Sequence, residues 1–101
     1  MREKLCCVYA ITNVVNGKQY VGSTKDFHER VVRHKRELRK NTHHNIYLQR
    51  AYLKYGLDSF TFTILESCNA DTLKNIEQAY LDTIEDSSLF YNISATASGG
   101  D

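Results

Sequence analysis

Six side chains in this sequence have the types that hydrolysis of a phosphodiester bond requires. They are two tyrosines, one arginine, two histidines and one glutamate: Tyr9, Tyr20, Arg30, His34, His43 and Glu77. A carboxylate can hold a hard divalent cation together with water, and a guanidinium can stabilise negative charge that develops on a phosphate. A positioned tyrosine or histidine can accept a proton from the attacking water. These groups can act together only if the fold brings them close to one another.

The pattern of residues 7–24 predicts a β-hairpin that carries both tyrosines. Asn16-Gly17 lies between apolar and β-branched residues and favours a two-residue type I′ turn, in which both central residues need positive φ. The cross-strand pairs expected from this turn are Val15 with Lys18, Asn13 with Tyr20, and Ile11 with Gly22. Tyr9 and Tyr20 then lie on the same face of the sheet. A one-residue slip would move Tyr20 to the other face, and either tyrosine could simply be a good strand residue.

The first helix is predicted over residues 26–40, with N-cap candidates at Ser23, Thr24 and Asp26. Its inward stripe consists of Phe27, Val31, His34 and Leu38. Arg30 lies on the flank of this stripe, which places a guanidinium at the edge of the buried face. His34 could equally be a hydrogen-bonded core histidine. The outer side carries four cations that can contact water or phosphate: Arg33, Arg36, Arg39 and Lys40.

Four further segments follow. A helix is predicted over 45–55, where apolar residues recur at helical spacing and Gly56 is a natural stop. Alternation of apolar and threonine residues predicts a strand over 60–65. A last helix is expected over 72–84, capped by Asn69 or Asp71, and a short return of the chain to the core over 89–93.

Glu77 is the most unusual residue of the second half. The inward stripe of the last helix consists of Leu73, Ile76, Tyr80, Leu81 and Ile84, and Glu77 falls inside it. A carboxylate on an apolar face is costly unless a cation, a hydrogen-bond donor or a metal compensates it. Glu77 is therefore either a metal ligand or one half of a structural ion pair with an arginine at the core edge.

Charge is distributed unevenly along the 101 residues. Residues 1–56 contain twelve basic side chains against four acidic ones, or +8, whereas residues 57–101 contain one lysine against eight acids, or −7. This asymmetry suggests a polyanionic partner for the first half, although any single cation could belong to a solvated helix face. The predicted contact residues are Lys25, Arg33, Arg36, Arg39 and Lys40.

The order of elements is strand, strand, helix, helix, strand, helix, which predicts an α+β fold with helices added to a small sheet. We expect one domain over 1–95 and a flexible tail or linker start over 96–101. Three cysteines, two of them adjacent, match neither a disulfide framework nor a spaced metal motif and favour a reducing, cytoplasmic setting. No apolar stretch is long enough to suggest a membrane span.

Val8-Tyr9, then Tyr20-Val21-Gly22, then an arginine eight residues after that glycine together resemble the signature of the GIY-YIG nuclease superfamily. The resemblance extends over nearly the whole chain, through the ordered segments YVGSTKDFHERVVRH, LQRAYLKYG, ILE, IEQAYL and YNI. It is greatest to the amino-terminal catalytic domains of phage intron homing endonucleases. One departure is Cys7, which stands where the signature has its first glycine. Because cysteine is small, we expect little loss from this change.

The resemblance implies a three-stranded antiparallel sheet flanked by three helices and a role for each candidate residue. Glu77 would be the metal-anchoring carboxylate, for Mg²⁺ or another divalent cation. Arg30 would stabilise the phosphate, Tyr9 would activate water, and Tyr20 would shape the site. His34 and His43 match assisting histidines, and Asn92 matches a supporting asparagine.

The resemblance also implies double-stranded DNA as substrate, products with 5′-phosphate and 3′-hydroxyl ends, and a phage-encoded or bacterial intracellular protein. Homing members continue into a DNA-binding domain, so we expect a missing C-terminal domain that holds most of the specificity. The alternatives are a repair or restriction type of GIY-YIG nuclease, a nucleic-acid-binding module that does not cut, and a protein-interaction domain that uses the acidic last helix.

Overall fold

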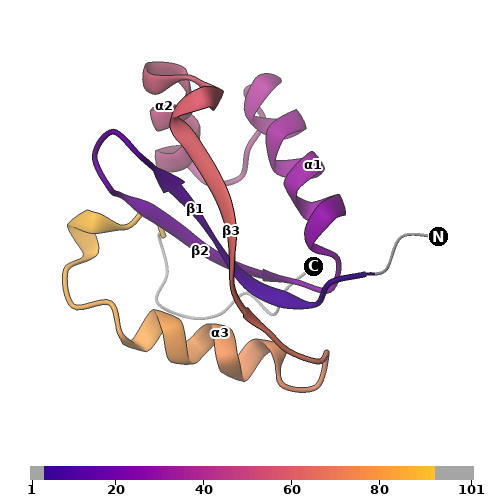
Figure 1. Ribbon diagram of the computed structural model, residues 1–101. Coiled ribbons are helices and arrows are strands. Elements are labelled where there is room, and N and C mark those ends of the chain that lie inside the picture. The colour runs from indigo at the N-terminus through magenta and orange to yellow at the C-terminus, as the bar shows by residue number, and fades with distance from the viewer. Residues whose placement is uncertain (1–3, 93–101) are drawn as a thin grey trace.

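The computed structural model describes residues 4–92 as three layers (Figure 1). An antiparallel sheet with the strand order β2, β1, β3 lies in the middle and consists of β1 (Cys7–Asn13), β2 (Gln19–Thr24) and β3 (Phe60–Ser67). Helices α1 (Phe27–Arg39) and α2 (Ile46–Tyr55) cover one face, and α3 (Leu73–Asp82) covers the other. This arrangement confirms the predicted α+β fold, with a three-stranded antiparallel sheet flanked by three helices.

Side-chain caps fix where the first two helices begin. The Asp26 carboxylate accepts a hydrogen bond from the Glu29 N–H at 3.3 Å, and the Asn45 side chain accepts one from the Leu48 N–H at 3.0 Å. The last helix differs from the prediction, because its N-cap is Thr72 rather than Asn69 or Asp71. Asn69 instead holds the preceding turn by accepting from the Thr72 N–H at 3.1 Å.

The hairpin between β1 and β2 has a different turn from the predicted one. Tyr20 pairs with Ile11 rather than with Asn13, and the connection is a four-residue loop over 14–17. Gly17 has a φ of +79° but Asn16 does not have positive φ, so the turn is not type I′. The longer loop is stable because the Asn13 side chain accepts from the Val15 N–H at 3.0 Å. Since the partner of Tyr20 changes by two residues, Tyr20 still lies on the predicted face.

Two buried clusters, one on each face of the sheet, follow from the alternation of side chains along the strands. The cluster beneath α1 and α2 contains Cys7, Tyr9, Ile11, Tyr20, Leu38, Leu48, Ala51, Phe60 and Tyr91. The cluster beneath α3 contains Val8, Val21, Leu73 and Leu81. Tyr9 and Tyr20 therefore share one face of the sheet, as predicted. This face is covered by α1 and α2, whereas Glu77 on α3 lies on the other side of the sheet.

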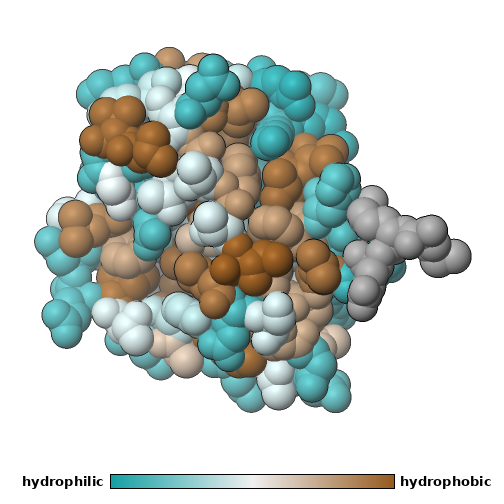
Figure 2. Space-filling model, viewed as in Figure 1, coloured by the Kyte–Doolittle hydropathy of each residue, from teal (hydrophilic) through white to brown (hydrophobic). Residues whose placement is uncertain are grey.

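The third strand forms one edge of the sheet and extends two residues beyond the predicted end, to Ser67. Ile64 and Leu65 on this strand are 39% and 37% exposed, and Figure 2 shows apolar side chains mixed with polar ones on the side of the molecule that it presents. No helix in the described part of the chain is long and apolar enough to cross a membrane.

The end of the described chain returns to the core, as expected, through a short 3-10 helix at Ser87–Leu89 and a parallel bridge between Phe90 and Gln19. Ile93, the predicted domain boundary at residue 95 and the predicted tail over 96–101 lie outside the described residues.

Candidate active site

A buried chain of hydrogen bonds joins three of the six candidate residues. The Tyr9 hydroxyl of β1 lies 2.6 Å from Nε2 of His34 on α1. Nδ1 of His34 lies 2.7 Å from Nε2 of His43, in the loop between α1 and α2. The backbone N–H of Asn45 completes the chain at 3.0 Å from Nδ1 of His43. The first of these contacts joins residues that are 25 positions apart in the sequence, and the second joins residues that are 9 positions apart.

The Asn45 N–H determines which group donates in each of these hydrogen bonds, because a backbone N–H can only donate. Burial lowers the pKa of His34 to about 2 and that of His43 to about 4, so both rings are neutral at pH 7. Nδ1 of His43 accepts from Asn45, and the single ring proton of His43 therefore sits on Nε2 and is donated to His34. The single ring proton of His34 is then on Nε2 and is donated to the Tyr9 oxygen.

His44 and Arg30 extend the site around this chain. Nε2 of His44 lies 3.3 Å from the Tyr20 hydroxyl, and its ring stacks on His43 with centroids 4.5 Å apart. Burial lowers the pKa of His44, and the charge of Arg30 lowers it further. The same guanidinium also contributes to the lowered pKa values of His34 and His43, after the larger effects of burial and of the neighbouring histidines. Arg30 is therefore close enough to affect all three rings.

Sequence reasoning missed two participants in this site. His44 is not among the site residues predicted from the sequence; its side chain is exposed, and its position beside His43 in the sequence was the signal that could have identified it. Asn45 was expected only as the start of a helix. In the structure it caps α2 through its side chain, donates from its backbone to His43, and donates from Nδ2 to the Tyr91 carbonyl at 2.9 Å.

Glu77 is buried on α3, with 3% of its surface exposed, and accepts a hydrogen bond from the Ser23 hydroxyl of β2. Within residues 4–92 no lysine or arginine pairs with it, which argues against the structural ion pair considered from the sequence. Glu77 and the tyrosines lie on opposite faces of the sheet. However, β2 is an edge strand, so groups on both of its faces border the same edge, which residues 90–92 partly cover.

Asn92 braces that edge. Its side chain accepts from the Val21 N–H at 2.9 Å and donates to the Val21 carbonyl at 2.8 Å, as a neighbouring strand would do. Val21 separates Tyr20 from Gly22, so Asn92 fixes the backbone that carries Tyr20. The supporting role expected for Asn92 remains a prediction, and this position is compatible with it.

The cations predicted to contact DNA, Lys25, Arg33, Arg36, Arg39 and Lys40, are exposed on α1 and beside its ends. They are not part of the histidine cluster. Arg33 lies 3.4 Å from Glu37 in an ion pair along the helix, and Nε of Arg39 donates to the Lys35 carbonyl at 3.2 Å.

One group of described residues could hold a metal ion. Glu37, His43 and His44 each offer one ligand atom, and these atoms lie within 4.8 Å of one another. Both ring nitrogens of His43 already make hydrogen bonds, to His34 and from Asn45, so this residue could bind an ion only after one of these bonds broke. Glu77 needs no such rearrangement.

The fold and the site together define a small α+β domain with a polar cluster beside the edge strand β2, and known proteins share this arrangement. The sequence profile of the GIY-YIG catalytic domain matches residues 5–89. The catalytic domain of intron endonuclease I-TevI, solved as a mutant, superposes with a TM-score of 0.82 at 34% identity, covering 92% of this chain and 97% of that one. A second structure of that domain gives 0.79 at 35% identity, covering 88% and 98%.

Two curated relatives of this chain are also described as intron endonucleases. A probable intron-encoded endonuclease 1 of Neurospora crassa is 37% identical over 97 residues, and intron-associated endonuclease 1 of Enterobacteria phage T4 is 38% identical over 96 residues. The alignments cover 89% and 93% of this chain but only 30% and 38% of those proteins. The chain therefore belongs to the GIY-YIG family of endonuclease catalytic domains. Nucleases of this family generally depend on divalent metal ions.

Proposed function

We propose that this domain hydrolyses phosphodiester bonds in double-stranded DNA, with Tyr9 as the general base. The observation that carries this proposal is the directed hydrogen-bond chain that ends on the Tyr9 oxygen. A hydrogen bond donated by Nε2 of His34 stabilises the phenolate form of Tyr9 relative to the phenol. Tyr9 that has released its own proton to solvent can then take a proton from the attacking water, and this phenolate form is more accessible at pH 7 than that of an ordinary tyrosine. His34 and His43 act here as neutral hydrogen-bond donors.

Arg30 is proposed to stabilise the transition state. Phosphodiester hydrolysis adds negative charge to the phosphate oxygens, and a guanidinium can donate two parallel hydrogen bonds to them. The neutral histidines beside Arg30 do not compete with the phosphate for its charge. Tyr20, held by His44 and by the backbone that Asn92 braces, would orient the phosphate next to Tyr9.

Glu77 is proposed to anchor Mg²⁺. A single buried carboxylate fits this ion, because Mg²⁺ keeps several waters and takes one or two carboxylates together with phosphate oxygens. When bound, the ion would supply positive charge at the phosphate and the leaving oxygen. The Ser23 hydroxyl, which donates to Glu77, would fix the orientation of the carboxylate.

The whole protein is proposed to be longer than this domain and to work inside the cell as a homing endonuclease. The chain spans 30% and 38% of the length of the curated relatives that it matches. A C-terminal DNA-binding domain would supply most of the site selection, and the domain described here would supply the chemistry.

Nicking of supercoiled plasmid in Mg²⁺ at low salt tests this proposal. We expect the wild type to cut, Tyr9→Phe to cut on the order of 10²- to 10⁴-fold more slowly, and Glu77→Gln or added chelator to abolish cutting. Phe keeps the ring of Tyr9, and Gln keeps the shape of Glu77, so both variants should fold. Cutting by Tyr9→Phe at the wild-type rate would remove Tyr9 as the base. Binding of DNA by the wild type without any cutting would favour a non-cleaving module.

A further inference from the structure

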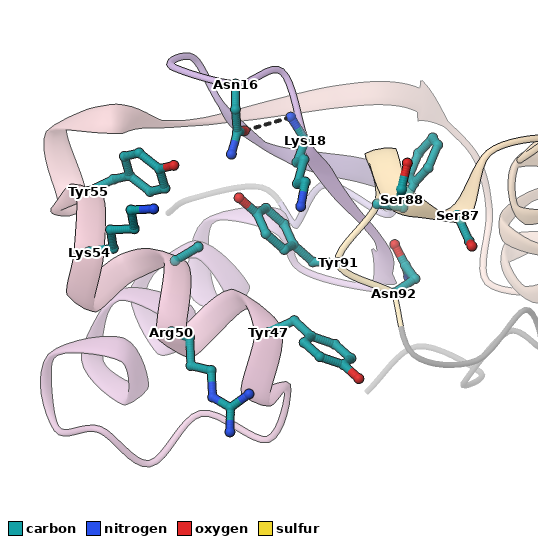
Figure 3. A pocket seen from close by; sticks show the side chains of 12 residues that line it. Asn16, Lys18, Tyr47, Arg50, Lys54, Tyr55, Ser87, Ser88, Tyr91 and Asn92 are labelled. Atoms are coloured by element: carbon teal, nitrogen blue, oxygen red, sulfur yellow. Dashed lines mark hydrogen bonds between the residues drawn. The ribbon is translucent and has the colours of Figure 1, made fainter.

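A groove separate from the histidine cluster lies on the α2 side of the molecule (Figure 3). It has a volume of about 600 Å³ and three walls: the hairpin loop, the exposed side of α2, and the last described segment of the chain. In Figure 3, Lys18 reaches from the hairpin toward Tyr91, while Lys54 and Tyr55 lie on one side of Tyr91 and Asn92 lies on the other.

The charge of this groove is positive. Lys18, Arg50 and Lys54 line it, and none of the described lining residues is an aspartate or a glutamate. In the part of the chain that the structure describes, none of these three cations forms an ion pair. Of the α1 cations, Arg33 differs in this respect, since it already pairs with Glu37. An exposed set of unneutralised cations is an electrostatic site for a polyanion.

Tyrosines alternate with these cations along the groove. Tyr47 of α2 is 52% exposed and Tyr55 lies under the Lys54 ammonium at 5.2 Å from the ring centroid, whereas Tyr91 is buried and contributes only to the lining. Cations for the phosphates and aromatic faces for sugars or bases are the combination that proteins use to hold a nucleic-acid strand. A small anion would need only the cations.

The wall of the groove is connected to the candidate active site by hydrogen bonds. The Tyr91 carbonyl accepts from Asn45, whose backbone N–H donates to His43. Asn92, the next lining residue, holds the edge of β2 at Val21, between Tyr20 and Gly22. A strand that leaves the groove past Asn92 therefore arrives at the edge of β2 that the active-site residues border.

We propose that this groove binds the sugar–phosphate backbone of the DNA strand next to the cut, with Lys18, Arg50 and Lys54 contacting its phosphates. This proposal rests on the proposed endonuclease function and adds to it a DNA contact surface distinct from the outer side of α1. The charge balance of the sequence does not distinguish the two surfaces, because both belong to the basic first half of the chain.

The test is the salt dependence of binding to a short DNA duplex, measured with chelator present so that nothing is cut. Arg50→Gln and Lys54→Gln each remove one groove cation and keep the aliphatic stem on an exposed, helix-favouring position. The matched control is Lys74→Gln, which removes one exposed cation from α3 on the other side of the sheet. Thermal unfolding of each variant checks that the fold is intact.

We expect each groove variant to bind several-fold more weakly than the wild type and to lower the slope of log K against log salt by about 0.9, the value for one lost phosphate contact. Lys74→Gln should leave the slope unchanged. Slopes that are equal for the groove variants and Lys74→Gln, while the wild type still binds and nicks plasmid, would overturn the groove and leave the endonuclease standing. A wild type that neither binds nor nicks DNA would overturn both.

Discussion

The hydrogen-bond chain through His43 and His34 determines that the Tyr9 oxygen accepts a hydrogen bond from His34. The proton positions follow from one backbone N–H, that of Asn45. Each neutral imidazole carries a single proton, so a ring that accepts a hydrogen bond at one nitrogen must donate from the other. If His34 or His43 were protonated, both of its ring nitrogens would be donors, and the ring could no longer accept a hydrogen bond from its neighbour. Burial keeps both rings neutral, and that burial has a measurable consequence for the stability of the domain.

Acid should destabilise the protein in a window set by these two histidines. Their folded-state pKa values are about 2 and about 4, below the unfolded value of 6.5. The stabilisation is therefore complete above pH 6.5 and is lost as the pH falls toward 4 and below, because only the unfolded chain takes up the protons. Between the unfolded and folded pKa values, we expect the free energy of unfolding to fall by on the order of 1 kcal/mol per pH unit for each histidine.

Urea unfolding between pH 7 and 4 would measure this slope. His28→Gln is the matched control, because His28 is exposed and lies outside the buried chain, so this variant should retain the full slope. A free energy of unfolding that stays constant from pH 7 to 5 would mean that His34 and His43 are not held neutral.

At the scale of elements, the close approach of β1 and β2 explains the glycine at position 22. Gly22 is opposite Tyr9 in the hairpin, and a Cβ added to Gly22 would lie 2.6 Å from the Tyr9 hydroxyl oxygen and 2.8 Å from its ring carbon Cζ. The stiff ring of Tyr9 would have to move. The glycine therefore leaves room for the phenol to reach His34. Cys7, in contrast, is fully buried on the α1 and α2 face, where its side chain belongs to the core cluster.

Gly22→Ala should consequently impair catalysis more than stability. We expect plasmid nicking to fall at least tenfold, because the displaced Tyr9 loses its hydrogen bond from His34. Gly56→Ala is the opposite case: nothing lies within 4 Å of its added Cβ, but its φ is +84°. That variant should lose roughly 1–3 kcal/mol of stability and keep its activity. Full activity of Gly22→Ala would mean that the position of Tyr9 is not critical.

At the scale of the whole molecule, charge divides the domain into a basic and an acidic part. The basic residues up to position 56 include the α1 and α2 cations, whereas eight of the twelve acids follow position 56, five of them in or around α3. Since α1 and α2 share one side of the sheet and α3 covers the other, the asymmetry along the sequence becomes an asymmetry between two faces. A polyanion would be attracted to the α1 and α2 side.

Charge reversal of the outer side of α1 tests this orientation. Arg36→Glu combined with Arg39→Glu should weaken DNA binding and flatten its salt dependence, by about 0.9 in slope for each lost phosphate contact. Lys74→Glu, on the acidic side, should have a much smaller effect. An unchanged salt slope in the double variant would remove the outer side of α1 from the DNA contact surface and leave the groove beside α2 as the candidate.

The sequence by itself determined the elements and the residue types of the site. Helical periodicity, the cap at Asp26 and the stop at Gly56 are local signals, because they depend on residues within one or two turns of each other. The placement of Tyr9 and Tyr20 on one face of the sheet followed from the alternation of side chains along a strand, which has a period of two residues. Glu77 was conspicuous because its burial could be inferred from its neighbours on the helix.

Only the tertiary structure decided the register of the hairpin, the partner of Glu77, the part played by His44 and Asn45, and the groove beside α2. Each depends on contacts between residues far apart in the chain. The loop of the hairpin, for example, is held partly by a hydrogen bond from the Val14 N–H to the Ser59 carbonyl at 2.8 Å, and Glu77 meets Ser23 across 54 positions. Local propensity carries no information about such pairs, because they are selected by the packing of whole elements against one another.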